Sequence, residues 1–201
     1  MFKKINKSIL KGSLVLLITI NLYNFFNFLF QFSMARMLSI VDYGVIATLM
    51  SFLYILGIFS ESIQTIITKY TSMEKNSGKL KNILKRTVKK SLFISSILFF
   101  IYLLIAIPLS SLLKINYPLI SIMGLTIFSS FLVPITRGVM QGRKMFKSLG
   151  FNLILESLSK LLIAVILIFL SFKVYGAVFA IVLSTFIALF FSLYSLKKII
   201  K

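Results

Sequence analysis

Long apolar runs, each of about 20 residues, constrain the fold of this chain more than any other feature of its sequence. A helix that rises 1.5 Å per residue crosses the roughly 30 Å hydrocarbon core of a bilayer in such a run. Charged residues make up 13% of the 201-residue chain, about half the share found in a soluble domain. Barrel strands would instead alternate in polarity over segments of about 10 residues. We therefore predict an all-α membrane protein.

The apolar runs predict one bundle of six transmembrane helices over residues 1–201. The predicted spans are about residues 13–34, 43–67, 91–113, 118–140, 149–172 and 175–196. The first follows four lysines but is too long for the apolar core of a signal peptide, so we expect it to be retained. Pro118 suits the first turn of the fourth span, and Pro134 is expected to kink that span.

Basic residues alternate between the two sides that these spans define. The predicted loop 69–90 holds eight Lys and Arg, and its side of the membrane holds 19 in all, against three on the other side. By the positive-inside rule, both termini and this loop are expected to be cytoplasmic. The net charge of +19 is then explained by topology and by attraction to anionic lipids. No binding motif accompanies the charge, so we expect no nucleic-acid partner.

The side chains that most catalytic and metal sites need are scarce. The chain has no Cys and no His, and its acids are Asp42, Glu61, Glu74 and Glu156. Thiol chemistry, the commonest metal ligand and the commonest general base are thereby excluded. We expect no enzyme, no cofactor and no metal site, and leave open a coupling ion, Na⁺ or H⁺.

Polar residues recur at helical spacing inside four of the six spans. At 100° per residue, those of the first, second, fourth and fifth spans each fall on one face of a helix. Such faces either hydrogen-bond across a packed bundle or line a water-accessible cavity. We favour a cavity lined by the first, second and fourth spans, because four amphipathic helices exceed what packing needs. The cavity candidates are Asn24, Asn27, Gln31, Tyr54, Glu61, Gln64, Ser129, Arg137 and Gln141.

Charged residues near these faces allow more than one interpretation. The candidates for contact with an anion are Lys69, Arg137 and Lys160, although Arg137 also fits a simple topology charge. Glu156 and Lys160 stand in the favourable order for an i,i+4 ion pair, which we expect to form. Glu61 lacks such a partner and is the candidate for a coupling-ion or proton site.

Two short motifs stand at the ends of predicted helices. Their sequences are Ala35-Arg36-Met37-Leu38 followed by Asp42-Tyr43-Gly44, and Arg137-Gly138-Val139-Met140-Gln141-Gly142 followed by Phe146. In order and placement they resemble two corners of the polysaccharide flippases, the Wzx/RfbX-like branch of the multidrug/oligosaccharidyl-lipid/polysaccharide exporter superfamily. The matching motif residues are Arg36, Asp42, Tyr43, Gly44, Gly138, Gln141 and Gly142. The resemblance runs from about residue 9 to the end of the chain.

Most of these motif residues have an architectural meaning. Gly44 is expected to let the second helix start close to the first, and Asp42 to cap that helix and complement its dipole. Gly138 and Gly142 are expected to permit close approach where the fourth span ends.

The resemblance implies an exporter of two six-helix lobes with a substrate cavity between them that opens alternately to each side. This chain would be one lobe, and its partner would be a missing C-terminal half, a split partner or a second copy. The implied cargo is an isoprenoid-linked oligosaccharide or polysaccharide precursor that crosses the cell membrane. Two alternatives stay open: a cation-coupled multidrug exporter of the same superfamily, and a non-transporting membrane scaffold or truncated relic.

Overall fold

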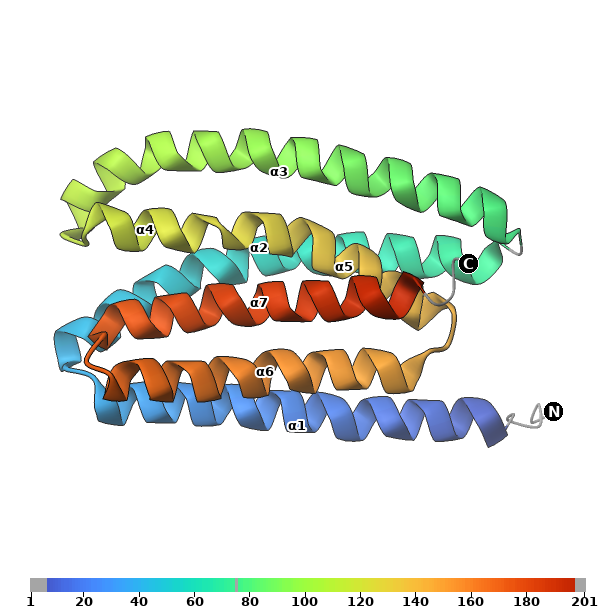
Figure 1. Ribbon diagram of the computed structural model, residues 1–201, viewed down its shortest axis with the longest axis horizontal. Coiled ribbons are helices and arrows are strands. Elements are labelled where there is room, and N and C mark those ends of the chain that lie inside the picture. The colour runs from blue at the N-terminus through green and yellow to red at the C-terminus, as the bar shows by residue number, and fades with distance from the viewer. Residues whose placement is uncertain (1–6, 75, 198–201) are drawn as a thin grey trace.

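The long apolar runs of the sequence form long helices. The computed structural model of the chain describes residues 7–74 and 76–197, and in this part the helices lie side by side along one axis (Figure 1). They are α1 (Lys7–Met37), α2 (Ile40–Met73), α3 (Ser77–Leu113), α4 (Tyr117–Gly124), α5 (Thr126–Gly142), α6 (Phe146–Phe169) and α7 (Lys173–Lys197). Six segments of the described chain are long and apolar enough to cross a membrane, the fourth of which combines α4 and α5. The predicted all-α architecture with six spans is thereby confirmed.

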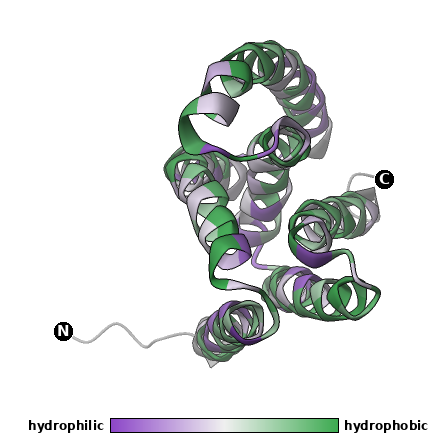
Figure 2. Ribbon diagram, turned by 90° about the vertical axis from the view of Figure 1, so that its left-hand side faces the viewer, coloured by the Kyte–Doolittle hydropathy of each residue, from purple (hydrophilic) through white to green (hydrophobic). Residues whose placement is uncertain are grey.

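The outer faces of the bundle are apolar. On α3, the side chains of Phe93, Phe100 and Leu104 are 68%, 67% and 69% exposed, and Figure 2 shows hydrophobic residues along the outward sides of the helices. Exposure of so much apolar surface to water would be unfavourable, whereas its contact with the hydrocarbon of a bilayer would not. These faces therefore belong in contact with lipid.

The basic stretch 69–90 is mostly helical, so the prediction of a long loop there is wrong. α2 continues to Met73 and α3 begins at Ser77. The reason is an apolar face that the charges obscure in the sequence, because Leu80 and Leu84 are buried against Ile67 of α2. With 34 and 37 residues, α2 and α3 are about 50 and about 55 Å long and extend beyond the hydrocarbon.

The fourth span consists of two helices that are separated at one residue. α4 begins at Tyr117 with Pro118 in its first turn, as expected. Pro134 lies inside α5, where the kink stays a prediction, and the span is interrupted at Leu125. The hydroxyl of Thr126 donates to the carbonyl of Met123 at 2.6 Å, and such a local bond competes with the regular helix ladder.

The start of α2 corrects two expectations about its motif residues. Ser39 is the N-cap: its hydroxyl accepts from the backbone N–H of Asp42 at 3.1 Å and donates to the Asp42 carboxylate at 2.9 Å. Asp42 thus supports the cap but does not form it. A Cβ atom added at Gly44 would meet no atom within 4 Å, so this glycine does not serve a close approach. α1 instead packs along α6 and makes few contacts with α2.

The expectation for Gly138 and Gly142 is confirmed. A Cβ atom on Gly138 would lie 2.8 Å from the carbonyl oxygen of Gln64, and one on Gly142 would lie 2.7 Å from that of Thr68. The two glycines, one turn apart, therefore let α5 cross directly against the backbone of α2.

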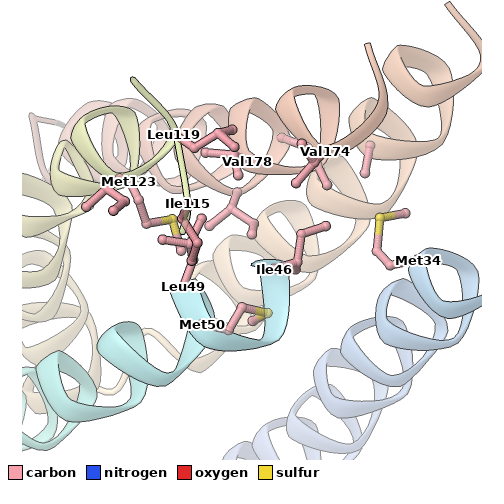
Figure 3. Close-up of a cluster of buried hydrophobic side chains, with 14 of the residues drawn as sticks. Met34, Ile46, Leu49, Met50, Ile115, Leu119, Met123, Val174 and Val178 are labelled. Carbon is pink, nitrogen blue, oxygen red and sulfur yellow. The ribbon is translucent and has the colours of Figure 1, made fainter. Parts of the chain in front are cut away.

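Buried apolar side chains hold the bundle together at each end. Near the turn between α1 and α2, a cluster joins Ile46 and Leu49 of α2 with Met123 of α4 and Val178 of α7 (Figure 3). A second cluster, which includes Ile67 and Leu80, lies near the other end. Between them the interior becomes polar.

Candidate functional site

A cavity of about 1150 Å³ lies between α1 and α2, with α5, α6 and α7 behind it. We call it the central cavity. All nine cavity candidates line it: Asn24, Asn27, Gln31, Tyr54, Glu61, Gln64, Ser129, Arg137 and Gln141. Lys69 and Lys160, the other candidates for anion contact, line it too. The structure thus brings together residues from α1, α2, α5 and α6, whose role as a binding site stays a prediction.

Some lining residues were not predicted from the sequence. Tyr23 precedes Asn27 by one helical turn on the same face of α1, so its spacing could have revealed it. Ser184 and Thr185 bring α7 into the wall. Their span showed no polar stripe, and both hydroxyls donate to carbonyls of α7 itself. Only the packing of the helices could show that α7 contributes.

An ion pair across two helices lies in the wall of the cavity. The Arg137 guanidinium on α5 donates to the Glu156 carboxylate on α6, and both side chains are largely buried. Its Nε also donates to Oδ1 of Asn152 at 2.7 Å, and the Asn152 amide donates to the carbonyl of Ala188 on α7 at 2.7 Å. This chain of bonds ties α5, α6 and α7 together around one charge pair.

The expected pair between Glu156 and Lys160 is wrong. The Lys160 ammonium points to α1, where it donates to Oδ1 of Asn27 and lies 5.0 Å from the centre of the Phe30 ring. Lys160 is only 8% exposed. An amide oxygen and an aromatic face compensate a buried cation only in part. Lys160 is therefore a buried cation of the cavity wall whose charge is only partly compensated.

Glu61 and Lys69 lie on exposed positions of α2. In the part of the chain that the structure describes, neither side chain makes an ion pair or a hydrogen bond. Both are therefore open to a ligand or to water in the cavity.

Direct polar contacts join α2 to α5 in the floor of the cavity. The Gln64 amide donates to Oε1 of Gln141 at 2.9 Å, and the hydroxyl of Ser60 donates to the carbonyl of Ser130 at 2.6 Å. These groups bond between helices and also face the cavity. Helix packing and cavity lining, which the sequence posed as alternatives, therefore coexist here.

The wall as a whole suits a ligand rich in hydroxyl groups that also carries negative charge. Amides and hydroxyls can exchange hydrogen bonds with such a ligand. The charges of Arg137 and Glu156 cancel each other. Among the other charged lining residues, Lys69 and Lys160 are positive and Glu61 is negative, so the wall keeps a small positive net charge.

Comparison with known proteins adds two findings. The sequence pattern of a family described as polysaccharide biosynthesis protein matches residues 9–201. Among solved structures, the chain is similar to a MOP superfamily transporter from Pyrococcus furiosus, with a TM-score of 0.74 and 16% sequence identity. This similarity covers 94% of the chain but 44% of the transporter, so the chain spans less than half of that protein's length. No curated protein matches the chain significantly.

Proposed function

The chain belongs to the polysaccharide biosynthesis protein family, and from this premise we propose that it is one lobe of a transporter for a lipid-linked oligosaccharide or polysaccharide precursor. It is a multi-pass membrane protein with the fold of one lobe of a MOP superfamily transporter. Such a lobe moves its cargo across the cytoplasmic membrane by rocking against a partner, which opens the cavity to each side in turn. It binds and releases the cargo and makes no covalent change.

The observation that carries this proposal is the composition of the central cavity. Its volume of about 1150 Å³ lies above the upper end of ordinary small-molecule sites. Amides such as Asn24 and Gln31 face it from α1, and these groups bond sugar hydroxyls as both donors and acceptors. An oligosaccharide is thus a better match than a compact apolar drug.

The phosphate end of the cargo is assigned to lysines. Arg137 already pairs with Glu156, so using it would leave a buried carboxylate without a partner. Lys160 has only neutral partners, and Lys69 lies on an exposed position of α2. We therefore favour Lys69 and Lys160 over Arg137 as the contacts of the phosphate groups.

A second six-helix lobe is proposed to cover the open side between α1 and α2. Large apolar side chains border the cavity there, with Phe28 and Tyr54 62% and 66% exposed. The partner would be a C-terminal half, a split partner or a second copy. Both ends of the described chain, the basic first turns of α3 and the basic turn between α5 and α6 lie at one end of the bundle (Figure 1). By the positive-inside rule, we place that end in the cytoplasm.

A pair of matched variants on α1 tests the proposal. Asn24 lines the cavity, whereas Asn21, also exposed and one turn away, does not. The double variant Asn24→Leu/Gln31→Leu should lower glycan export by about tenfold or more, because each lost hydrogen bond costs about 1 kcal/mol. Asn21→Leu should export normally. Asn27 is left intact because it holds Lys160.

The measurement uses cells whose own flippase has been deleted and which carry the full transporter. Surface glycan, accumulated lipid-linked precursor and the amount of protein in the membrane are measured together. Normal export by the cavity variant at normal membrane levels would refute a role of the cavity and favour a scaffold.

A cation-coupled drug exporter is less well supported. Such a protein needs carboxylates in its cavity that are free to meet a cationic drug. Glu156 is already paired with Arg137, which leaves Glu61 as the acid of the cavity wall that could serve.

A further inference from the structure

A second pocket, of about 560 Å³, lies at the end of the bundle away from the termini. We call it the distal pocket. Its lining residues come from or next to three turns, those between α1 and α2, α3 and α4, and α6 and α7, which lie at the same end of the bundle in Figure 1. Its lining residues are Asp42, Asn116, Ser171, Phe172, Lys173, Val174, Tyr175 and Phe179. Nothing in the transport cycle proposed above uses this pocket.

Several polar groups around the distal pocket have unused hydrogen-bonding capacity. One carboxylate oxygen of Asp42 accepts from Ser39, while the other has no hydrogen-bond partner among the described residues. Asn116 occupies the N-cap position of α4, but its side chain makes no capping bond. Lys173 is exposed, and within the described chain its ammonium forms no ion pair with Asp42. The pocket thus offers a strong acceptor, an amide and a donor that the fold itself does not use.

Aromatic rings stand beside these polar groups. Phe172 and Phe179 are 50% and 37% exposed although both line the pocket. A pyranose ring has two chemically different parts: an apolar C–H face that packs on aromatic rings, and a rim of hydroxyl groups that bond carboxylates and amides. Exposed rings together with a carboxylate and an amide match both parts, whereas a lipid tail or a metal ion would match only one.

The backbone around the pocket holds its residues in costly conformations. The described chain contains four non-glycine residues with positive φ. Three of them, Lys114, Ser171 and Lys173, lie in or directly after two of the bordering turns, with φ of 53°, 67° and 47°. Each left-handed residue costs about 1 kcal/mol or more, and such strain gathers at ligand sites. Ser171 and Lys173 flank Phe172, so the strained turn fixes where this ring is presented.

We propose that the distal pocket binds one pyranose unit of a glycan, with Phe172 against the face of the sugar and Asp42 and Asn116 bonded to its hydroxyl groups. The residues that bind this sugar are separate from those that line the central cavity. If the proposed function and orientation hold, the pocket lies on the side where the glycan emerges. It would there hold the leading sugar after the cavity has opened.

Saturation-transfer NMR on the full chain in lipid nanodiscs tests this proposal. The probes are glucose, galactose, N-acetylglucosamine and glucuronate, and millimolar affinity is expected from a few exposed hydrogen bonds. Asn116→Ala and Phe172→Ala should each weaken binding of the preferred sugar by about tenfold. Phe169→Ala is the matched control, because Phe169 is 77% exposed at the end of α6 but does not line the pocket.

The central-cavity variant Asn24→Leu/Gln31→Leu separates this proposal from the proposed function. The distal pocket is supported if the sugar signal survives in that variant and is lost in Asn116→Ala and Phe172→Ala, with thermal unfolding unchanged. The pocket is refuted if no probe gives a signal. It is also refuted if only the central-cavity variant loses the signal, an outcome that would leave the proposed function standing.

Discussion

Replacing Gly138 with alanine should loosen the crossing of α2 and α5. A Cβ atom at this position would lie 2.8 Å from the carbonyl oxygen of Gln64 and 2.8 Å from Cβ of Ile67. Neither atom is the far end of a flexible side chain. The two helices must therefore move apart, which also disturbs the bond between the Thr68 hydroxyl and the Gly138 carbonyl, 3.3 Å long in the native structure.

The expected magnitude combines two opposing effects. Alanine gains up to about 1 kcal/mol over glycine in a helix interior, because its backbone loses less entropy on folding. Overpacking costs about 1–3 kcal/mol, and two contacts with rigid atoms place Gly138 toward the upper part of that range. The net effect should be a destabilisation of about 1–2 kcal/mol.

Gly57 on α2 provides the matched control. A Cβ atom there would meet no atom within 4 Å, so Gly57→Ala keeps the helix-propensity gain without the clash. It should stabilise the protein by up to about 1 kcal/mol. The same chemical substitution should thus change the free energy of unfolding in opposite directions at the two sites.

Equilibrium unfolding in mixed micelles, followed by circular dichroism, measures both effects as shifts of the denaturant midpoint. The contact argument fails if Gly138→Ala is as stable as the wild-type chain. It fails equally if Gly57→Ala is destabilised as much as Gly138→Ala, because helix packing would then not distinguish the two sites.

Three further predictions use the same unfolding measurement. Ser39→Ala should cost about 1 kcal/mol by removing the cap of α2, and an unchanged midpoint would contradict that role. Arg137→Gln and Glu156→Gln should each destabilise the protein. The double variant should lose less free energy of unfolding than the sum of the two single losses, with a coupling energy of about 1–3 kcal/mol. Additive losses would show that the pair does not interact. Lys160→Met should be neutral or stabilising because it removes a buried charge, whereas Asn27→Leu should cost about 2 kcal/mol or more because it leaves that charge without its acceptor. Equal effects of these last two variants would count against the contact.

Much of the fold and many lining residues of the central cavity could be predicted from the sequence, because helices and their polar faces follow from local periodicity. An apolar run as long as the bilayer is thick predicts a membrane span, and polar residues at helical spacing predict which face of that span is turned away from lipid. The sequence therefore predicts that Asn24, Gln31 and Gln64 face the interior, and all three line the central cavity. The roles of these residues in transport stay predictions.

The same local rules failed wherever a residue had two possible partners or a segment had two faces. Glu156 had Lys160 in the favourable position on its own helix, yet it pairs with Arg137 of α5. The many charges of stretch 69–90 suggested a loop, although Leu80 and Leu84 give it a buried face. In both cases the deciding neighbour lies on another helix.

The sequence by itself determined that the chain is a helical membrane bundle, how many spans it has, and which side of most helices is polar. Only the tertiary structure decided how these faces meet: that α7 joins the cavity wall, that Lys160 turns to Asn27, and that three distant turns enclose the distal pocket. The physical reason is the distance along the sequence over which each kind of interaction acts. Helix formation and amphipathicity depend on residues within two turns of one another, whereas an ion pair or a pocket depends on how separate helices pack, which no local pattern encodes.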